Sequence, residues 1–276
     1  MGRIKLIAFD LDGTLFNDKK EVTAETFETL ERAAGMGIEI VPCTGRFWEA
    51  IPESIKAMRF VRYVISLNGA AIFDVKEMKT LAEFLIPSER AVTLLKVFDE
   101  LPVIYDAVAN GKGYMKREHY ERLAEVMIGE WQVKVVKDHR IPVDDIFDVI
   151  AKAGGSQKMQ MYTLDAKLRE NLLSSLPHVF PKALFTSSVP NNIEINDLKA
   201  NKGEGLKFLA DYLGIPMEST LAFGDGLNDI RMIQNAGIGV AMANAVDEVK
   251  GIADYVTLDC NHDGVAEGIK KFCFRQ

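Results

Sequence analysis

The sequence has 276 residues, 48% of them hydrophobic and 26% charged, which is enough apolar material for one large core or two unequal ones. The formal net charge is −7, and lysine and arginine do not gather into a basic stripe. Nucleic acid and anionic membrane surfaces are therefore disfavoured as partners, and a small molecule is expected.

The cysteines and the N-terminal apolar stretch bear on the cellular compartment. Cys43, Cys260 and Cys273 are odd in number and form no CxxC pair, so they indicate a reducing environment without a disulfide framework. Residues 1–9 are too short for a signal peptide, and no stretch approaches the roughly 18 apolar residues of a membrane span. We expect a cytoplasmic protein. The sequence does not reveal the oligomeric state, and a monomer is the starting expectation.

Four short apolar runs are typical of buried strands, and each stops at a cluster of Gly, Asp, Asn or Thr. They cover residues 4–9, 38–43, 64–67 and 220–223. Helix-spaced apolar residues predict helices at 24–34 and at Lys202–Leu213. Strands that alternate with helices predict an α/β fold, a Rossmann-like doubly wound parallel sheet with helices on both faces.

The middle of the chain has a different pattern. Here helices are predicted at 88–101, 118–127, 144–152 and 165–176, and strand-like pieces at 131–136, 158–163 and 182–187. None of these strands ends in a polar cluster, and Pro87 and Pro190 punctuate the two ends of the segment. We predict a catalytic core of residues 1–84 and 190–276, with an inserted α+β cap domain at 85–189.

The polar clusters that close the core strands are expected to converge, because ligands of an open parallel sheet bind beyond the carboxyl ends of its strands. In chain order the clusters are Asp10-Leu11-Asp12-Gly13-Thr14, Thr44-Gly45-Arg46, Asn68-Gly69 and Gly224-Asp225-Gly226-Leu227-Asn228-Asp229. Gathering their four carboxylates around one crevice is unfavourable without a cation. A set of oxygen ligands favours a hard ion, and we predict Mg²⁺.

Other residues fit a bound phosphate. Lys202 opens a predicted helix, where a positive side chain opposes the helix dipole unless an anion lies nearby. Thr44 and the backbone N–H groups around Gly45 can donate hydrogen bonds to phosphate oxygens. We predict that Asp10 attacks phosphorus to form an aspartyl phosphate, and that Asp12 acts first as general acid and then as general base.

These motifs resemble the haloacid dehalogenase superfamily, and within it the Cof-like phosphatases, which carry a large cap between the second and third motifs. The first motif is DLDGTL at 10–15 and the fourth is GDGLND at 224–229. Thr44-Gly45-Arg46 is similar to the second motif and Lys202-Gly203 to the third. One departure is that the Pro and Gly usual between the Glu194-Ile195 pair and Lys202 are missing, which leaves the path of that loop open.

The resemblance implies a Rossmannoid core and a phosphoric monoester hydrolase. It implies Mg²⁺ bound by Asp10, the backbone carbonyl of Asp12, and Asp225. It makes Asp10 the nucleophile, Asp12 the acid and base, and Thr44, Lys202 and Asn228 phosphate ligands. We also assign Leu11 and Gly45 to the phosphate site, and Asp229 and Arg46 to supporting roles. In the cap, His139, Arg140 and Lys158 are candidate contacts for the leaving group.

The leading hypothesis is thus a Mg²⁺-dependent phosphatase acting on a small phosphorylated metabolite, a sugar phosphate by preference. Two alternatives remain open: a phosphomutase or phosphotransferase that passes the phosphoryl group to another hydroxyl, and a non-catalytic protein that binds a phosphorylated ligand. Other motifs are excluded at named positions. An EF-hand would need Gly at Leu15, and a dinucleotide fingerprint would need Gly at Asp229.

Overall fold

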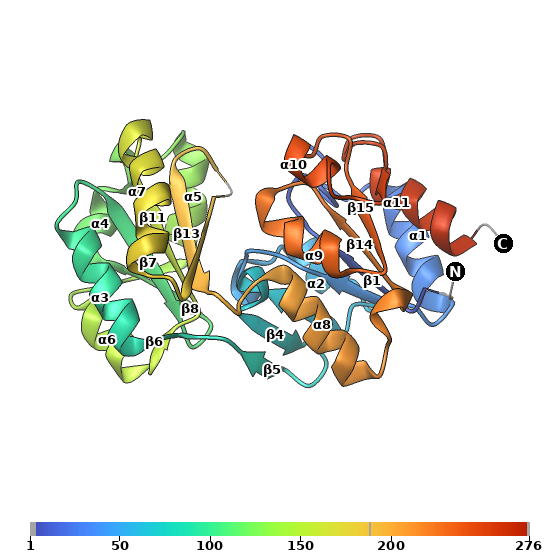
Figure 1. Cartoon of the computed structure of the whole chain (residues 1–276), viewed down its shortest axis with the longest axis horizontal. Helices are drawn as coiled ribbons and strands as arrows, with labels where there is room; N and C mark the ends of the chain where they lie inside the picture. The colour runs from blue at the N-terminus through green and yellow to red at the C-terminus, as the bar shows by residue number, and fades with distance from the viewer. Residues whose placement is uncertain (1–3, 188, 275–276) are drawn as a thin grey trace. The chain divides into compact units, whose positions relative to one another are not determined.

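The computed structural model describes residues 4–187 and 189–274, which form two compact units (Figure 1). Unit 1 combines the described residues up to Arg46, Ile51–Ala82, and those from Asn201 onward. Unit 2 consists of Phe47–Ala50 and Glu83–Ala200. No helix of the described part has the length and hydrophobicity that a membrane span requires.

Unit 1 is built on a parallel sheet of five strands in the order β16-β15-β14-β1-β2. The strands are β1 (Leu6–Phe9), β2 (Glu39–Pro42), β14 (Thr220–Gly224), β15 (Ile238–Ala241) and β16 (Tyr255–Val256). All four residues of β1 are buried, as expected for a strand with helices on both faces of its sheet. The predicted α/β class with a parallel core sheet is confirmed.

The helices of unit 1 are α1 (Ala24–Gly35), α2 (Glu53–Lys56), α8 (Lys202–Leu213), α9 (Ile230–Asn235), α10 (Asp247–Lys250) and α11 (Gly264–Ile269). Helix α1 packs against α11 and helix α8 against α9, and Figure 1 shows these pairs on opposite sides of the sheet. Asn201 caps α8, since its side chain accepts a hydrogen bond from the Glu204 N–H at 3.0 Å. The helices predicted at 24–34 and Lys202–Leu213 are therefore confirmed.

The third predicted core strand is not part of the parallel sheet. β3 (Tyr63–Ser66) pairs antiparallel with β4 (Ala71–Asp74), in a separate sheet that continues to β5 (Lys79–Glu83). An isolated parallel bridge between Cys43 and Ile65 links it to the end of β2. The carboxyl end of β3 thus still lies beside that of β2, although β3 is not a member of the parallel sheet.

Unit 2 contains a mixed sheet of six strands in the order β12-β13-β11-β7-β8-β9. They are β7 (Ile104–Ala109), β8 (Lys112–Lys116), β9 (Arg140–Val143), β11 (Lys158–Tyr162), β12 (Ala183–Thr186) and β13 (Asn192–Asp197). The pairs are antiparallel except for β8 with β9. A small ladder joins β6 (Ile86–Pro87) to β10 (Gly155–Ser156). The core boundary predicted at residue 190 falls just before β13.

Among the described residues of unit 2, five α-helices cover the sheet: α3 (Ser88–Asp99), α4 (Arg117–Glu121), α5 (Glu130–Asp138), α6 (Ile146–Lys152) and α7 (Ala166–Val179). Two of the predicted elements were wrong. The strand predicted at 131–136 lies inside α5, where the buried side chains are Gln132 and Val136, one helical turn apart, while Trp131 is 61% exposed. The single helix predicted at 118–127 is interrupted after α4 and continues as a short 3-10 turn, Leu123–Glu125.

Candidate active site

The register of the core sheet brings the ends of β1, β14 and β2 together. Phe9 is level with Phe223 on one side and with Pro42 on the other. The next residue, Asp10, donates its N–H to Phe223 O at 3.1 Å, and Cys43 donates its N–H to Phe9 O at 2.8 Å. Side chains from three distant segments therefore emerge at one edge of the sheet.

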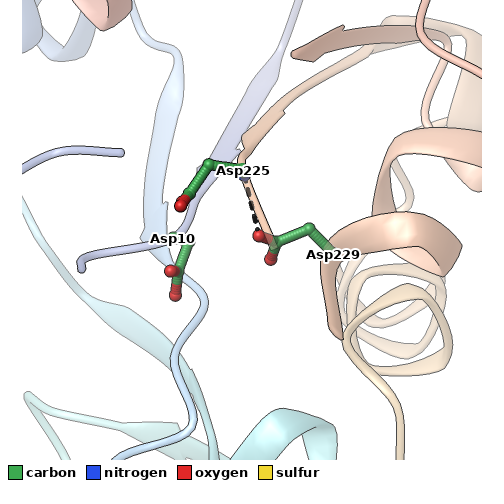
Figure 2. A group of neighbouring side chains, drawn as sticks. All are labelled: Asp10, Asp225 and Asp229. Carbon is green, nitrogen blue, oxygen red and sulfur yellow. Dashed lines mark hydrogen bonds between the residues drawn. The ribbon is translucent and has the colours of Figure 1, made fainter. Parts of the chain in front are cut away.

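Three carboxylates form the centre of this edge (Figure 2). Asp10 follows β1, Asp225 follows β14, and Asp229 precedes α9. One oxygen from each lies within 4.8 Å of the others. Like charges at this separation repel strongly in a buried site, so the cluster needs a positive partner.

Lys202, the first residue of α8, supplies part of that charge. Its side chain is fully buried, and Nζ lies 2.6 Å from Asp10 Oδ1 and 2.6 Å from Asp229 Oδ1. Burial by itself lowers the pKa of this amine, but the two carboxylates outweigh burial, and the pKa of Lys202 is raised. The lysine remains an ammonium at neutral pH, fixed between the two acids.

Asp229 acts through both of its oxygens. Oδ1 accepts from Lys202, and Oδ2 accepts the backbone N–H groups of Asp225 and Gly226, both at 2.9 Å. Figure 2 shows the bond between Asp225 and Asp229. These bonds fix the loop that carries Asp225. Because both oxygens are already engaged, Asp229 is suited to supporting the site and less suited to binding an ion directly.

Asp225 approaches the first motif closely. Its Oδ1 accepts a hydrogen bond of 2.6 Å from Thr14 Oγ1. Gly13 has a φ of +82°, and a Cβ at this position would lie 2.4 Å from Asp225 Oδ2, so only glycine fits here. Among the described residues, none donates a hydrogen bond to Asp10 Oδ2 or Asp225 Oδ2.

The pKa values indicate that the cluster is short of positive charge. Burial, together with Asp229 and Asp225, raises the pKa of Asp10 to about 8 despite the lowering effect of Lys202. Burial and Asp229 raise the pKa of Asp225 to about 6. Asp10 is buried and Asp225 is half-buried, and each has one oxygen that accepts no hydrogen bond from the described residues. Two such carboxylates, both with raised pKa values, are the donor set that a hard divalent cation binds. The residues therefore fit a metal ion.

Asp12 has other partners. Arg46 Nε lies 2.9 Å from its Oδ2 and Nη2 lies 3.0 Å from its Oδ1, a bidentate pair, and Lys20 Nζ lies 2.9 Å from Oδ1. Burial raises the pKa of Asp12, but Arg46 and Lys20 outweigh it, and the pKa is lowered. Asp12 is thus held as a carboxylate apart from the acidic cluster. Lys20, whose own backbone φ is +62°, was not among the site residues predicted from the sequence.

The second motif follows β2 directly. Thr44 is buried; its N–H donates to Ile65 O at 2.8 Å, and its Oγ1 accepts from the Arg46 N–H at 3.2 Å. Gly45 lies between them. The Leu11 side chain is buried in the core, so only its backbone is available to a ligand. The Cys43 thiol is buried, and burial raises its pKa, in keeping with a packing role.

The fourth motif meets the loop after β3. Asn228 Nδ2 donates a hydrogen bond of 3.2 Å to Asn68 Oδ1. The sequence pattern predicts Asn68 only as part of the polar cluster that closes a strand, and the structure adds its contact with Asn228.

The candidate cap residues lie in buried or packed settings within unit 2. Arg140 Nε is 3.0 Å from Asp106 Oδ2, and Lys158 Nζ is 2.9 Å from Glu194 Oε1. His139 packs edge-on against Phe47, with ring centroids 5.9 Å apart. These polar groups are engaged with other protein groups of the same unit.

Known proteins resemble this chain in sequence over nearly its whole length. A sequence model of the haloacid dehalogenase-like hydrolases matches residues 7–269. The phosphatase YwpJ of Bacillus subtilis is 32% identical over 97% of this chain and 99% of its own length. The 5-amino-6-(5-phospho-D-ribitylamino)uracil phosphatase YcsE of Bacillus subtilis is 32% identical over 97% of this chain and 95% of its own.

The fold has close counterparts among solved structures as well. A sugar phosphatase of haloacid dehalogenase subclass IIB superposes with a TM-score of 0.79 at 25% identity, covering 97% of this chain and 98% of that one. Sequence and fold therefore agree along nearly the whole chain. The chain belongs to the haloacid dehalogenase-like hydrolase family, and it is a phosphatase of that family.

Proposed function

We propose that this phosphatase hydrolyses a small phosphorylated metabolite, a sugar phosphate, in a Mg²⁺-dependent reaction that passes through a phosphorylated Asp10. The observation that carries the proposal is the state of the Asp10 carboxylate. One of its oxygens is held at 2.6 Å by a buried ammonium, while the other accepts no hydrogen bond from the described residues. A carboxylate fixed in this way is preorganised for attack by its remaining oxygen.

In the first half-reaction, an Asp10 oxygen forms a bond to phosphorus as the bond from phosphorus to the leaving oxygen breaks. The leaving oxygen keeps the electron pair and takes a proton from Asp12. In the second half-reaction, Asp12 accepts a proton from water as the water oxygen attacks phosphorus. Inorganic phosphate leaves and the Asp10 carboxylate is restored.

Asp12 must carry a proton for the first half-reaction, yet Arg46 and Lys20 hold it as a carboxylate. We assign its acid form to the substrate complex, because a phosphate dianion beside Asp12 opposes its ionisation and competes for the two cations. The ionised form described here is the one that serves as base in the second half-reaction.

The cation would be held by Asp10, Asp225 and the backbone carbonyl of Asp12. When bound, Mg²⁺ neutralises these acids so that a phosphate dianion can approach, and it stabilises charge on the transferred phosphoryl group. Asp229 supports the set by orienting Lys202 and the Asp225 loop.

The phosphate ligands we propose are Lys202, Thr44, Asn228 and the backbone N–H groups near Leu11 and Gly45. Lys202 stands at the start of α8, where the helix dipole also favours an anion. Because its ammonium is already oriented by two carboxylates, it can meet a phosphate oxygen without reorganisation.

The substrate class is supported by two similar proteins, one a sugar phosphatase and the other a 5-amino-6-(5-phospho-D-ribitylamino)uracil phosphatase. We further propose that unit 2 acts as the specificity domain. A phosphotransferase shares all the residues above, so the nature of the acceptor distinguishes it from a hydrolase.

The test is a panel of sugar phosphates and other phosphorylated metabolites, ranked by kcat/KM with Mg²⁺, with EDTA, and with added acceptor sugars. The expected result is release of inorganic phosphate from a sugar phosphate, abolished by EDTA. Mass spectrometry of acid-quenched single turnovers should find one phosphoryl group on the peptide that contains Asp10. Transfer to the acceptor would identify a phosphotransferase instead, and binding of the panel without turnover would identify a non-catalytic protein.

A further inference from the structure

The loop after β3 has an unusual backbone. Leu67, Asn68 and Gly69 have φ values of +54°, +58° and +93°, three consecutive residues in the left-handed region. Glycine and asparagine tolerate this conformation, but leucine does so at a steric cost. A strained turn persists only where the surrounding structure determines it, and such turns cluster at functional sites.

Two backbone hydrogen bonds fix this left-handed turn (Leu67–Gly69) to the second motif. The Leu67 N–H donates to Arg46 O at 3.0 Å, and the Asn68 N–H donates to Thr44 O at 3.0 Å. The turn therefore forms the far side of the loop that carries Thr44. Its position is set by the same segment that is proposed to contact phosphate.

The turn also contacts the start of α8. A Cβ on Gly69 would lie 2.2 Å from Asn201 O, so the two backbones are in direct contact. Asn201 is the residue that caps α8, and Lys202 comes next. Glycine is required at this position by both its φ and its surroundings.

The Asn68 side chain makes the third connection. It is buried, and its Oδ1 accepts the hydrogen bond of 3.2 Å from Asn228 Nδ2, across 160 residues of sequence. The amide of an asparagine can present either its oxygen or its NH₂ group to a ligand. Because Asn68 offers an oxygen acceptor, the Asn228 amide is oriented with its nitrogen toward Asn68. The hydrogen bond to Asn68 uses one hydrogen of that nitrogen, and it thereby fixes the direction of the other hydrogen.

We propose that Asn68 is a positioning residue of the phosphate site: it orients the Asn228 amide so that N–H, and not oxygen, faces the phosphate. This inference rests on the proposed function, in which Asn228 is a phosphate ligand. An inverted amide would place a carbonyl oxygen against an anion. The left-handed turn thus contacts the second, third and fourth motifs.

The test uses Asn68→Gly, which removes the amide while keeping a residue that tolerates a positive φ. We expect kcat/KM for the best substrate to fall about tenfold and the inhibition constant of inorganic phosphate to rise about tenfold, mainly through KM, with little change in Tm. Asn110→Gly is the matched control: Asn110 is exposed, has a φ of +49°, and should show wild-type kinetics.

A double-mutant cycle separates positioning from a general structural effect. Asn228→Ala should lower kcat/KM by roughly ten- to a hundredfold, and adding N68G to N228A should change it no further. Equal losses from N68G in both backgrounds would overturn the inference, as would wild-type kinetics of N68G beside an impaired N228A. Wild-type kinetics of N68G beside an impaired N228A would contradict the inference but not the proposed function.

If N228A itself keeps wild-type kinetics, both the inference and the phosphate role of Asn228 fail. Asn68→Ser, which keeps a side-chain oxygen, covers the case in which N68G does not fold. It should lose less activity than N68G would, and its effect should likewise vanish in the N228A background. A loss that persists there would count against the inference.

Discussion

Asp10→Asn is the most informative single change, because it should abolish turnover and at the same time stabilise the metal-free protein. Burial and the neighbouring acids raise the pKa of Asp10 from 3.8 to about 8. At pH 7 the unfolded chain carries the ionised form, which the folded site disfavours. The difference of about 3 pH units between 3.8 and 7 corresponds to roughly 4 kcal/mol as an upper bound. Asparagine has no charge to bury, so the variant avoids this cost.

The loss of the bond between Asp10 and the Lys202 ammonium offsets part of that gain, so we expect a rise of several degrees in the Tm of the metal-free variant at pH 7. With the proposed nucleophile removed, kcat should fall by at least about a thousandfold. Added Mg²⁺ should raise the Tm of the variant less than that of the wild type, because one of the proposed carboxylate ligands is gone.

The assays are scanning calorimetry with EDTA and with Mg²⁺, and steady-state release of phosphate. Asp145→Asn serves as the matched control, because asparagine also caps helices well and Asp145 is not a residue of the candidate active site. Turnover within tenfold of the wild type would refute the assignment of Asp10 as nucleophile. A lower Tm of the metal-free variant would refute the account of its buried charge.

Three further predictions follow from the described geometry. Since the pKa values of Asp10 and Asp225 are raised to about 8 and about 6, Mg²⁺ must displace protons that the folded site binds below those values. Its affinity should therefore rise by up to tenfold per pH unit between pH 6 and 8 and level off above; a pH-independent affinity in calorimetric titrations would contradict this. Gly13→Ala should weaken Mg²⁺ binding by at least about tenfold by pushing Asp225 aside, whereas Gly37→Ala, with the same φ of +82° but open surroundings, should not. Asp145→Ala should cost about 1 kcal/mol in denaturant unfolding, because its carboxylate caps α6 through two backbone N–H groups, with kcat unchanged.

The centre of the site could be predicted because its signals are local. An apolar run that stops at Asp10, and another that stops just before Asp225, each identify a strand end, and parallel strands present such ends at one edge. Local sequence signals do not specify which strands lie next to each other in a sheet. The pairing of β3 with β4 in a separate sheet depends on the left-handed turn between them, whose leucine gives no indication of a positive φ.

The elements of unit 2 were harder to predict from the sequence, because contacts between distant residues also decide their structure. Strand β13 buries Asn192, Glu194 and Asn196 on one face, and such polar residues do not suggest a buried strand. Their burial is made possible by partners far away in the sequence: Lys158 pairs with Glu194, and Gln157 O accepts from Asn196 Nδ2 at 2.9 Å. The helix α5 was missed because Trp131, Val133 and Val135 alternate as they would in a strand.

The pairing of β1 with β14 has a consequence for biosynthesis. Two adjacent strands at the heart of unit 1 are separated by more than 200 residues, since Leu6 pairs with Thr220. Nearly all of unit 2 is one continuous stretch, Glu83–Ala200, and the ribosome completes it before β14 exists. We expect the inserted unit to fold first during translation, while β1 cannot yet pair with β14. Nascent chains stalled before β14 should yield a protease-resistant fragment from unit 2 and none from β1.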